Sequence, residues 1–222
     1  NQYLAIGGGT NIGAASYLGA NLSGALSFAP QGAFGGDLNV GFTRSDRISV
    51  VSVTSGGLSN SGDLRGRLRY RPGGGDNGSA LEFGGWYALG FDLLSPQLSG
   101  ITSAAAGCSS SVCDTNQLSG FSWLSNRVGF DAKYRPFPKT GFTLELDSGL
   151  RNYPYFASNP VVNIDSVPIR AMVGFGTLLT TRFFFSTKVG YSALLFSGPN
   201  VGVLKSPFEQ NVAGQLELGL RI

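Results

Sequence analysis

The chain has 222 residues, a formal net charge of +3 and a charged fraction of 13%, which is about half the share usual in soluble domains. Its glycines follow no three-residue period, and Leu, Val, Ile and Phe are too frequent and regular for a disordered chain, which excludes collagen and disorder. No apolar run is long enough for a membrane helix, and the small net charge does not indicate a nucleic-acid partner.

Apolar side chains at every second position predict β-strands, because successive residues of a strand point to opposite faces. The first predicted strand, 2–9, is the weakest, with only Leu4 and Ile6 before three glycines. The next two strands, 16–29 and 33–44, repeat the alternation with leucine, valine and phenylalanine.

The clearest alternation lies in 64–71. Its polar face carries Arg65, Arg67, Arg69 and Arg71. The face between them is apolar, with Leu64, Leu68 and Tyr70. A helix would scatter the arginines around its circumference, so this segment is predicted to be a strand with four guanidinium groups on one face.

Further segments continue the pattern to the end of the chain. In each, apolar residues alternate with glycine, serine or charged residues. These predicted strands are 81–93, 121–135, 141–152, 166–179, 183–196 and a last one from 212 to 222.

Low charge without a spanning helix predicts a transmembrane β-barrel, whose apolar residues are hidden at every second position. We therefore expect an all-β fold, a single domain over 1–222 that is a closed antiparallel transmembrane barrel of about ten strands, with eight strands as the alternative. A soluble sandwich also alternates, but its polar face is rich in Lys, Glu and Thr. Here the polar face is mostly Gly, Ser and compensating charges, which suits the interior of a narrow barrel.

The connections alternate in length. The short ones are 30–32, 72–78, 137–140 and 180–181, and the longer ones are about 45–60, 95–119, 157–165 and 198–208. Outer-membrane barrels have short periplasmic turns and long outer loops. With 2–9 as the first strand, both termini are expected in the periplasm, and this parity favours ten strands over nine.

The sequence resembles the small outer-membrane β-barrel proteins of Gram-negative bacteria over essentially its whole length. The resemblance rests on the two-residue repeat, on a terminal strand with Leu216, Leu218, Leu220 and Ile222, and on aromatic residues near strand ends: Phe28, Tyr134, Phe156, Phe183 and Phe196. Members usually end in an aromatic residue, and Ile222 departs from this. No signal peptide begins at Asn1, so a mature chain is expected. The resemblance implies the bacterial outer membrane as the location and its lipid as surroundings.

The absence of His excludes an imidazole base or metal ligand. The enzymes among such barrels are omptin proteases, the outer-membrane phospholipase, and the lipid A deacylase and palmitoyltransferase. Resemblance to these families would imply a catalytic His, so they are disfavoured. No motif supports a His-free Ser-Lys or carboxylate mechanism. We expect neither an enzyme nor a cofactor.

Two cysteines, Cys108 and Cys113, fall within the longest predicted loop. In an oxidising compartment, cysteines this close most simply form a small-loop disulfide. A redox or metal pair is the alternative. The spacing is not CxxC and no other Cys or His could complete a metal site, so we expect the disulfide.

Charged residues gather on the predicted inward face, with bases in surplus. The predicted lumen charge network comprises Arg65, Arg67, Arg69, Arg71, Asp37, Glu82, Asp92, Arg127, Asp131, Glu145, Asp147 and Arg151. One interpretation is a cross-strand salt-bridge network that fills the lumen. The other is a narrow anion-selective pore. Ten strands enclose little space once arginines occupy it, which favours the network.

Inward glycines also have two interpretations: they make room for long neighbouring side chains, or they keep a lumen open. The weakly charged segments 48–54 and 104–106 either bind another protein or pack within the loops. We therefore expect a non-enzymatic structural anchor or interaction subunit of a cell-envelope assembly, with protein partners at outer loops or periplasmic turns. A narrow passive channel with anion preference is the alternative.

Overall fold

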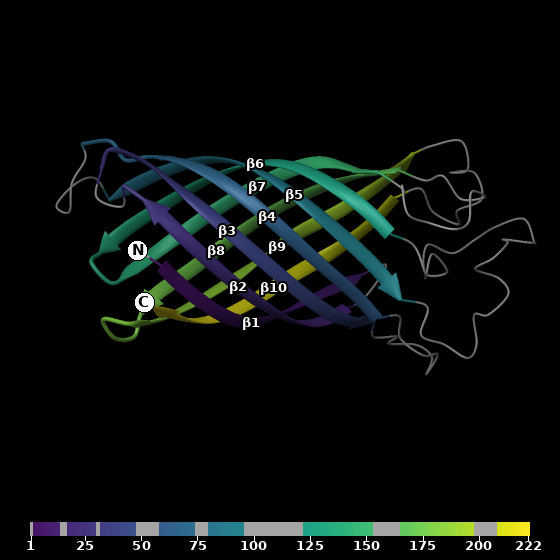
Figure 1. Ribbon diagram of the computed structural model, residues 1–222, viewed down its shortest axis with the longest axis horizontal. Coiled ribbons are helices and arrows are strands. Elements are labelled where there is room, and N and C mark those ends of the chain that lie inside the picture. The colour runs from purple at the N-terminus through teal and green to yellow at the C-terminus, as the bar shows by residue number, and fades with distance from the viewer. Residues whose placement is uncertain are drawn as a thin grey trace, which may run out of the picture.

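The computed structural model describes residues 2–13, 17–29, 32–47, 58–73, 80–95, 122–152, 165–197 and 208–222. These residues form a closed barrel of tilted strands (Figure 1). The strands are β1 Gln2–Gly13, β2 Tyr17–Phe28, β3 Phe34–Arg47, β4 Leu58–Tyr70, β5 Leu81–Ser95, β6 Ser122–Phe137, β7 Thr140–Asn152, β8 Asp165–Leu178, β9 Phe183–Ser197 and β10 Phe208–Arg221. Within the described ranges, no helix is long and apolar enough to cross a membrane.

Each strand pairs antiparallel with its neighbours in the sequence, and β1 pairs with β10 to close the ring. The closing register places Tyr3 opposite Arg221 and Ile12 opposite Val212. Closure removes the two free edges that an open sheet would present to lipid, where each unpaired backbone group costs several kcal/mol. The predicted ten-stranded antiparallel barrel is confirmed, including the weakly patterned first strand.

The outer surface is apolar, as the alternation predicts. Leu68 on β4 is 78% exposed because its cross-strand neighbours on the same face are Gly36 and Gly85. Aromatic rings are exposed on the outer face near one end of the barrel, at Phe28, Phe34, Tyr70, Tyr134, Phe137 and Phe183. Aromatic girdles of this kind are typical of the membrane interface of outer-membrane barrels. Phe196 is half-buried, and Phe156 lies outside the described residues.

The two ends of the barrel differ in their connections. One, here called the turn end, holds both chain termini, the turns 138–139 and 179–182, and the strand ends on either side of 29–33 and 71–80, of which 30–31 and 74–79 lie outside the described residues (Figure 1). At the other, the loop end, β1, β3, β5, β7 and β9 end and the strand that follows each of them begins. The segments that join them, 14–16, 48–57, 96–121, 153–164 and 198–207, lie outside the described residues. Cys108, Cys113 and the segments 48–54 and 104–106 belong to these segments, so their predicted disulfide and contacts stay predictions.

Several strands extend further toward the loop end than the sequence predicts. Strand β4 begins at Leu58 where a strand start at 64 was expected, and β3 continues to Arg47, so that the predicted 45–60 loop is shorter. Strand β10 begins at Phe208 and not at 212. The two-residue pattern arises where one face of a strand contacts lipid. It is absent from 59–63, which contain no apolar side chain although the strand continues.

Candidate functional site: charged side chains across the lumen

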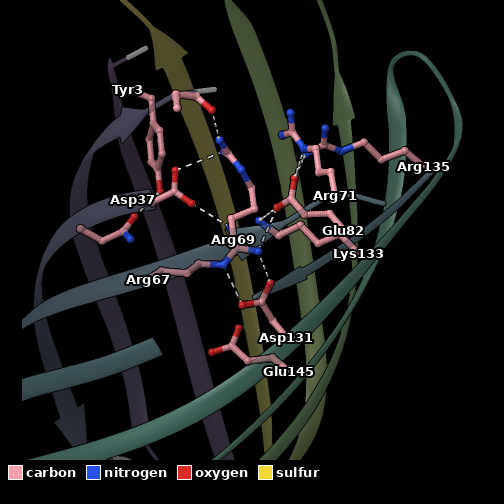
Figure 2. Close-up of polar contacts among 12 residues, drawn as sticks. Tyr3, Asp37, Arg67, Arg69, Arg71, Glu82, Asp131, Lys133, Arg135 and Glu145 are labelled. Carbon is pink, nitrogen blue, oxygen red and sulfur yellow. Dashed lines mark hydrogen bonds and ion pairs between the residues drawn. The ribbon is translucent and has the colours of Figure 1, made fainter. Parts of the chain in front are cut away.

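The first charged cluster centres on the guanidinium of Arg67 in β4, which is flanked by carboxylates from three other strands (Figure 2). Its Nε donates to Asp131 Oδ1 at 2.8 Å and its Nη2 to Asp131 Oδ2 at 2.5 Å, a two-pronged pair between β4 and β6. Its Nη1 lies 2.7 Å from Asp37 Oδ2, and Nη2 also lies 2.8 Å from Glu82 Oε1. Charge-assisted, bidentate bonds of this type are among the strongest polar contacts in proteins.

The carboxylate of Glu82, which contacts Arg67, also lies close to three further basic side chains. Arg71 Nε lies 2.7 Å from its Oε2, Arg135 Nη2 3.3 Å from the same oxygen, and Lys133 Nζ 3.7 Å from its Oε1. These bases come from β6 and from the residue that follows β4. One buried carboxylate therefore joins the turn-end residues of two strands.

Arg69 ties the cluster to the turn between β2 and β3. Its Nη2 donates to the Ala29 carbonyl at 2.6 Å, and its Nη1 lies 3.6 Å from Asp37 Oδ1. Ala29 has a φ of 46°, a left-handed conformation that is uncommon for a residue with a side chain. The arginine thus holds the carbonyl of a constrained turn.

A second cluster lies on β7, where Glu145 receives bases from three strands. Lys188 Nζ on β9 lies 2.7 Å from Oε2, and Arg170 Nη2 on β8 lies 3.0 Å from Oε1. Arg65 Nη1 on β4 approaches Oε1 at 3.4 Å, a contact that crosses the lumen between non-neighbouring strands. Asp147 then pairs with Arg170 Nε at 2.7 Å and with Arg127 Nη1 at 3.7 Å.

Aromatic side chains occupy the space around these clusters. Trp86 on β5 is buried, with the guanidiniums of Arg65 and Arg127 over its ring at 5.1 and 5.8 Å from the centroid. Tyr3 packs edge-on against Phe184 at 5.5 Å and donates through its hydroxyl to Asn39 at 3.0 Å. Tyr3 and Phe184 were not singled out from the sequence, although both have the parity of inward residues on their strands.

Glycines on the inner face lie where these large side chains need room. A Cβ at Gly84 would meet the Arg67 guanidinium and Asp131, one at Gly129 the Trp86 indole, and one at Gly219 the Phe184 ring. A Cβ at Gly35 would meet Arg69. These four positions fit the interpretation that glycine makes room for neighbours.

The structure brings together most residues of the predicted network. Ion pairs join Arg65, Arg67, Arg69, Arg71, Asp37, Glu82, Arg127, Asp131, Glu145 and Asp147. Asp92 lies opposite Ser61 in register, toward the loop end and away from Arg67, and its side chain is outside the described part. Arg151 also lies toward the loop end, opposite Ser125 and Ser166. Asp63, which was placed outside a strand, joins the inner face of β4 beside Gly41.

The central charges are withdrawn from solvent. The solvent-exposed fraction is 2% for Glu82, 4% for Asp131 and Glu145, and 6% for Arg67 and Asp147. In the ion pairs described above, bases outnumber carboxylates, so the layer carries a positive excess. Among the described residues, no group of three or more His, Cys, Asp or Glu could hold a metal ion. The arrangement is suited to bracing the wall and obstructing the lumen.

No family model matches the chain. No curated protein matches it either. Among solved structures, it is similar to the β-domain of the Bordetella autotransporter BrkA, with a TM-score of 0.53 and 12% identity, over 100% of this chain and 98% of that one. It is also similar to the translocator domain of the autotransporter NalP from Neisseria meningitidis, with a TM-score of 0.50 and 11% identity, over 100% and 87% of the two chains. The chain has the fold of an outer-membrane β-barrel.

Proposed function

We propose that this protein is a closed, non-enzymatic barrel of the bacterial outer membrane that acts as a structural anchor or interaction subunit of a cell-envelope assembly. The observation that carries the proposal is the buried charged layer, in which side chains from β3 to β9 meet inside the barrel. Residues committed to mutual ion pairs in a narrow lumen leave little room for a solute. Breaking such buried pairs is costly, which favours a wall that stays closed.

The proposed orientation follows from the connections. The two longest connections, 96–121 and 153–164, join strands at the loop end, whereas both termini and the tightest turns, 138–139 and 179–182, lie at the turn end. In outer-membrane barrels the short turns face the periplasm and the long loops face the exterior. The turn end is therefore assigned to the periplasm and the loop end to the exterior. In this orientation the Cys108 and Cys113 disulfide stays a prediction for an outer loop. Protein partners would bind the outer loops or the periplasmic turns.

Orientation is tested by cysteine labelling on whole cells. In a variant without Cys108 and Cys113, a cysteine is placed either at Ser109 or at Gly75, and an impermeant reagent is added. Labelling at 109 but not at 75 supports the proposal. Labelling at 75 but not at 109 reverses the orientation.

The role is tested by two measurements on the same detergent-purified protein. Affinity purification in mild detergent should retain partner proteins in fixed stoichiometry, and the purified barrel should give no reproducible conductance in planar bilayers. A barrel that purifies alone and conducts would contradict the proposal.

The second candidate is a narrow anion-preferring channel, and the positive excess of the lumen layer favours it. Reversal potentials in a salt gradient distinguish the two. Steady conductance with anion preference that falls when Arg65 is replaced by Gln supports the channel, because Arg65 reaches across the lumen.

A further inference from the structure

Basic side chains gather at the turn end around the opening of the barrel. Arg71, Lys133, Arg135 and Arg221 have the inward parity of their strands or strand ends, while Lys139 and Arg182 are exposed in the adjacent turns 138–139 and 179–182. These six residues are called the basic mouth. Arg71 and Arg135 approach one another above Glu82 (Figure 2).

The basic mouth has few carboxylates to balance it. Glu82 contacts Arg71, Lys133 and Arg135 but is shared with Arg67 deeper in the lumen. Within the part of the chain that the structure describes, Lys139, Arg182 and Arg221 form no ion pair. Asp76, in the turn between β4 and β5, lies outside that part.

The cations remain accessible from the aqueous side. The side chains of Arg135 and Lys133 are 48% and 34% exposed, and Lys139, Arg182 and Arg221 are exposed residues. The residues that precede Arg71, Arg135 and Arg221 in the chain point to the opposite, lipid-facing side of the wall. They are Tyr70, Tyr134 and Leu220. Because the mouth residues on the strands point inward, they are presented to a ligand at the opening and not to lipid headgroups around the wall.

The spread of the charges selects the type of ligand. A single exposed ion pair contributes little, so one isolated carboxylate or phosphate would bind weakly. The basic mouth includes residues at the turn-end termini of β4, β6 and β10 and in the turns 138–139 and 179–182. Charges distributed in this way can contact several carboxylates along one chain at the same time. Arginine forks also match carboxylates in two-pronged geometry.

We propose that the basic mouth binds an acidic segment of a periplasmic partner protein, rich in Asp and Glu. This inference rests on the proposed function, because it names the partner chemistry for the turn end of an interaction subunit. Attraction between the cationic opening and an anionic segment would also steer the partner to this end of the barrel.

The probe is a fluorescent octa-glutamate peptide, titrated against the full chain in lipid nanodiscs by fluorescence anisotropy. We expect saturable binding that weakens as salt is raised. The double variant Arg182→Gln/Arg221→Gln, which removes no described ion pair, should weaken binding roughly fivefold. Arg135→Gln should weaken it further, since Arg135 is the most exposed base over Glu82.

The matched control is Arg44→Gln, an exposed arginine on β3 toward the loop end. It removes a positive charge at a distance from the mouth and should leave the peptide affinity unchanged. Heat resistance of the folded band on semi-native gels verifies that each variant is folded.

Three results would overturn the proposal. They are absence of octa-glutamate binding, an equal loss in the Arg44→Gln control, and full competition by inorganic phosphate or by anionic lipid vesicles at matched charge. The proposed function is judged separately by wild-type conductance. A conducting barrel that still binds the peptide overturns the closed-anchor proposal alone, and a closed barrel that ignores the peptide overturns this one alone.

Discussion

The two walls of the lumen differ in the size of their side chains. Strands β3 to β9 project arginine, lysine, glutamate, aspartate and tryptophan inward, whereas β1 and β2 present mostly small residues such as Ala5, Gly7 and Ala25. The long side chains of the charged wall reach across the lumen, so mainly small residues fit on the wall that faces them. The lumen is therefore filled mainly by side chains of the charged wall. We expect substitutions of those side chains to lower the free energy of unfolding more than substitutions on the wall of small residues.

The largest expected effect is that of Arg67→Leu. It leaves Asp37 and Asp131 in a confined space without their main partner. Removing one member of a buried pair costs about 3–5 kcal/mol, less where water enters. Urea unfolding in lipid vesicles measures the loss. Arg44→Leu, exposed on β3, is the control, and equal effects of the two substitutions would remove the distinction between the charged wall and the surface.

Adjacent glycines on β5 offer a sharper comparison. A Cβ at Gly84 would meet Arg67 and Asp131, whereas at Gly85, on the lipid side, it would meet nothing within 4 Å. Overpacking a filled interior costs about 1–3 kcal/mol, so Gly84→Ala should destabilise the barrel by that amount. Gly85→Ala should change the free energy of unfolding by less than about 0.5 kcal/mol. If both are neutral, the space beside Arg67 is not filled.

The smallest effect concerns the wall of small residues. Tyr3→Phe removes the hydroxyl that bonds to Asn39 and should cost about 1 kcal/mol in the free energy of unfolding. Tyr70→Phe is the control, because its ring lies on the outer face against Phe34. An unchanged free energy of unfolding in Tyr3→Phe would mean that the inner hydrogen bond contributes nothing.

The architecture was predictable from the sequence because lipid imposes a two-residue period on every strand. The arginines of 64–71 specify the inward phase of β4 without knowledge of its neighbours. Strand ends were less predictable. Beyond the apolar band the period disappears, so the predicted strand began only at Leu64 and left out 58–63, including Asp63.

The inward set of charges was also predictable, but the pairing was not. Arg67 contacts Glu82 and Asp37, which lie on the adjacent strands. Its two-pronged partner is Asp131, two strands away, and Arg65 reaches Glu145 on β7. Such contacts depend on the tilt and register of the strands around the closed barrel. The sequence of a single strand does not predict either.

The central claim, that side chains of the charged wall close the lumen, is tested most directly by planar-bilayer conductance of the wild type and of Arg67→Ala/Arg69→Ala. These substitutions remove the base between Asp37 and Asp131 and the one that holds the turn at Ala29. We predict a silent wild type and a double variant that conducts and loses heat resistance on semi-native gels. A wild type that already conducts, with a double variant that only lowers anion preference at unchanged heat resistance, would contradict the account and identify the arginines as the lining of an open pore.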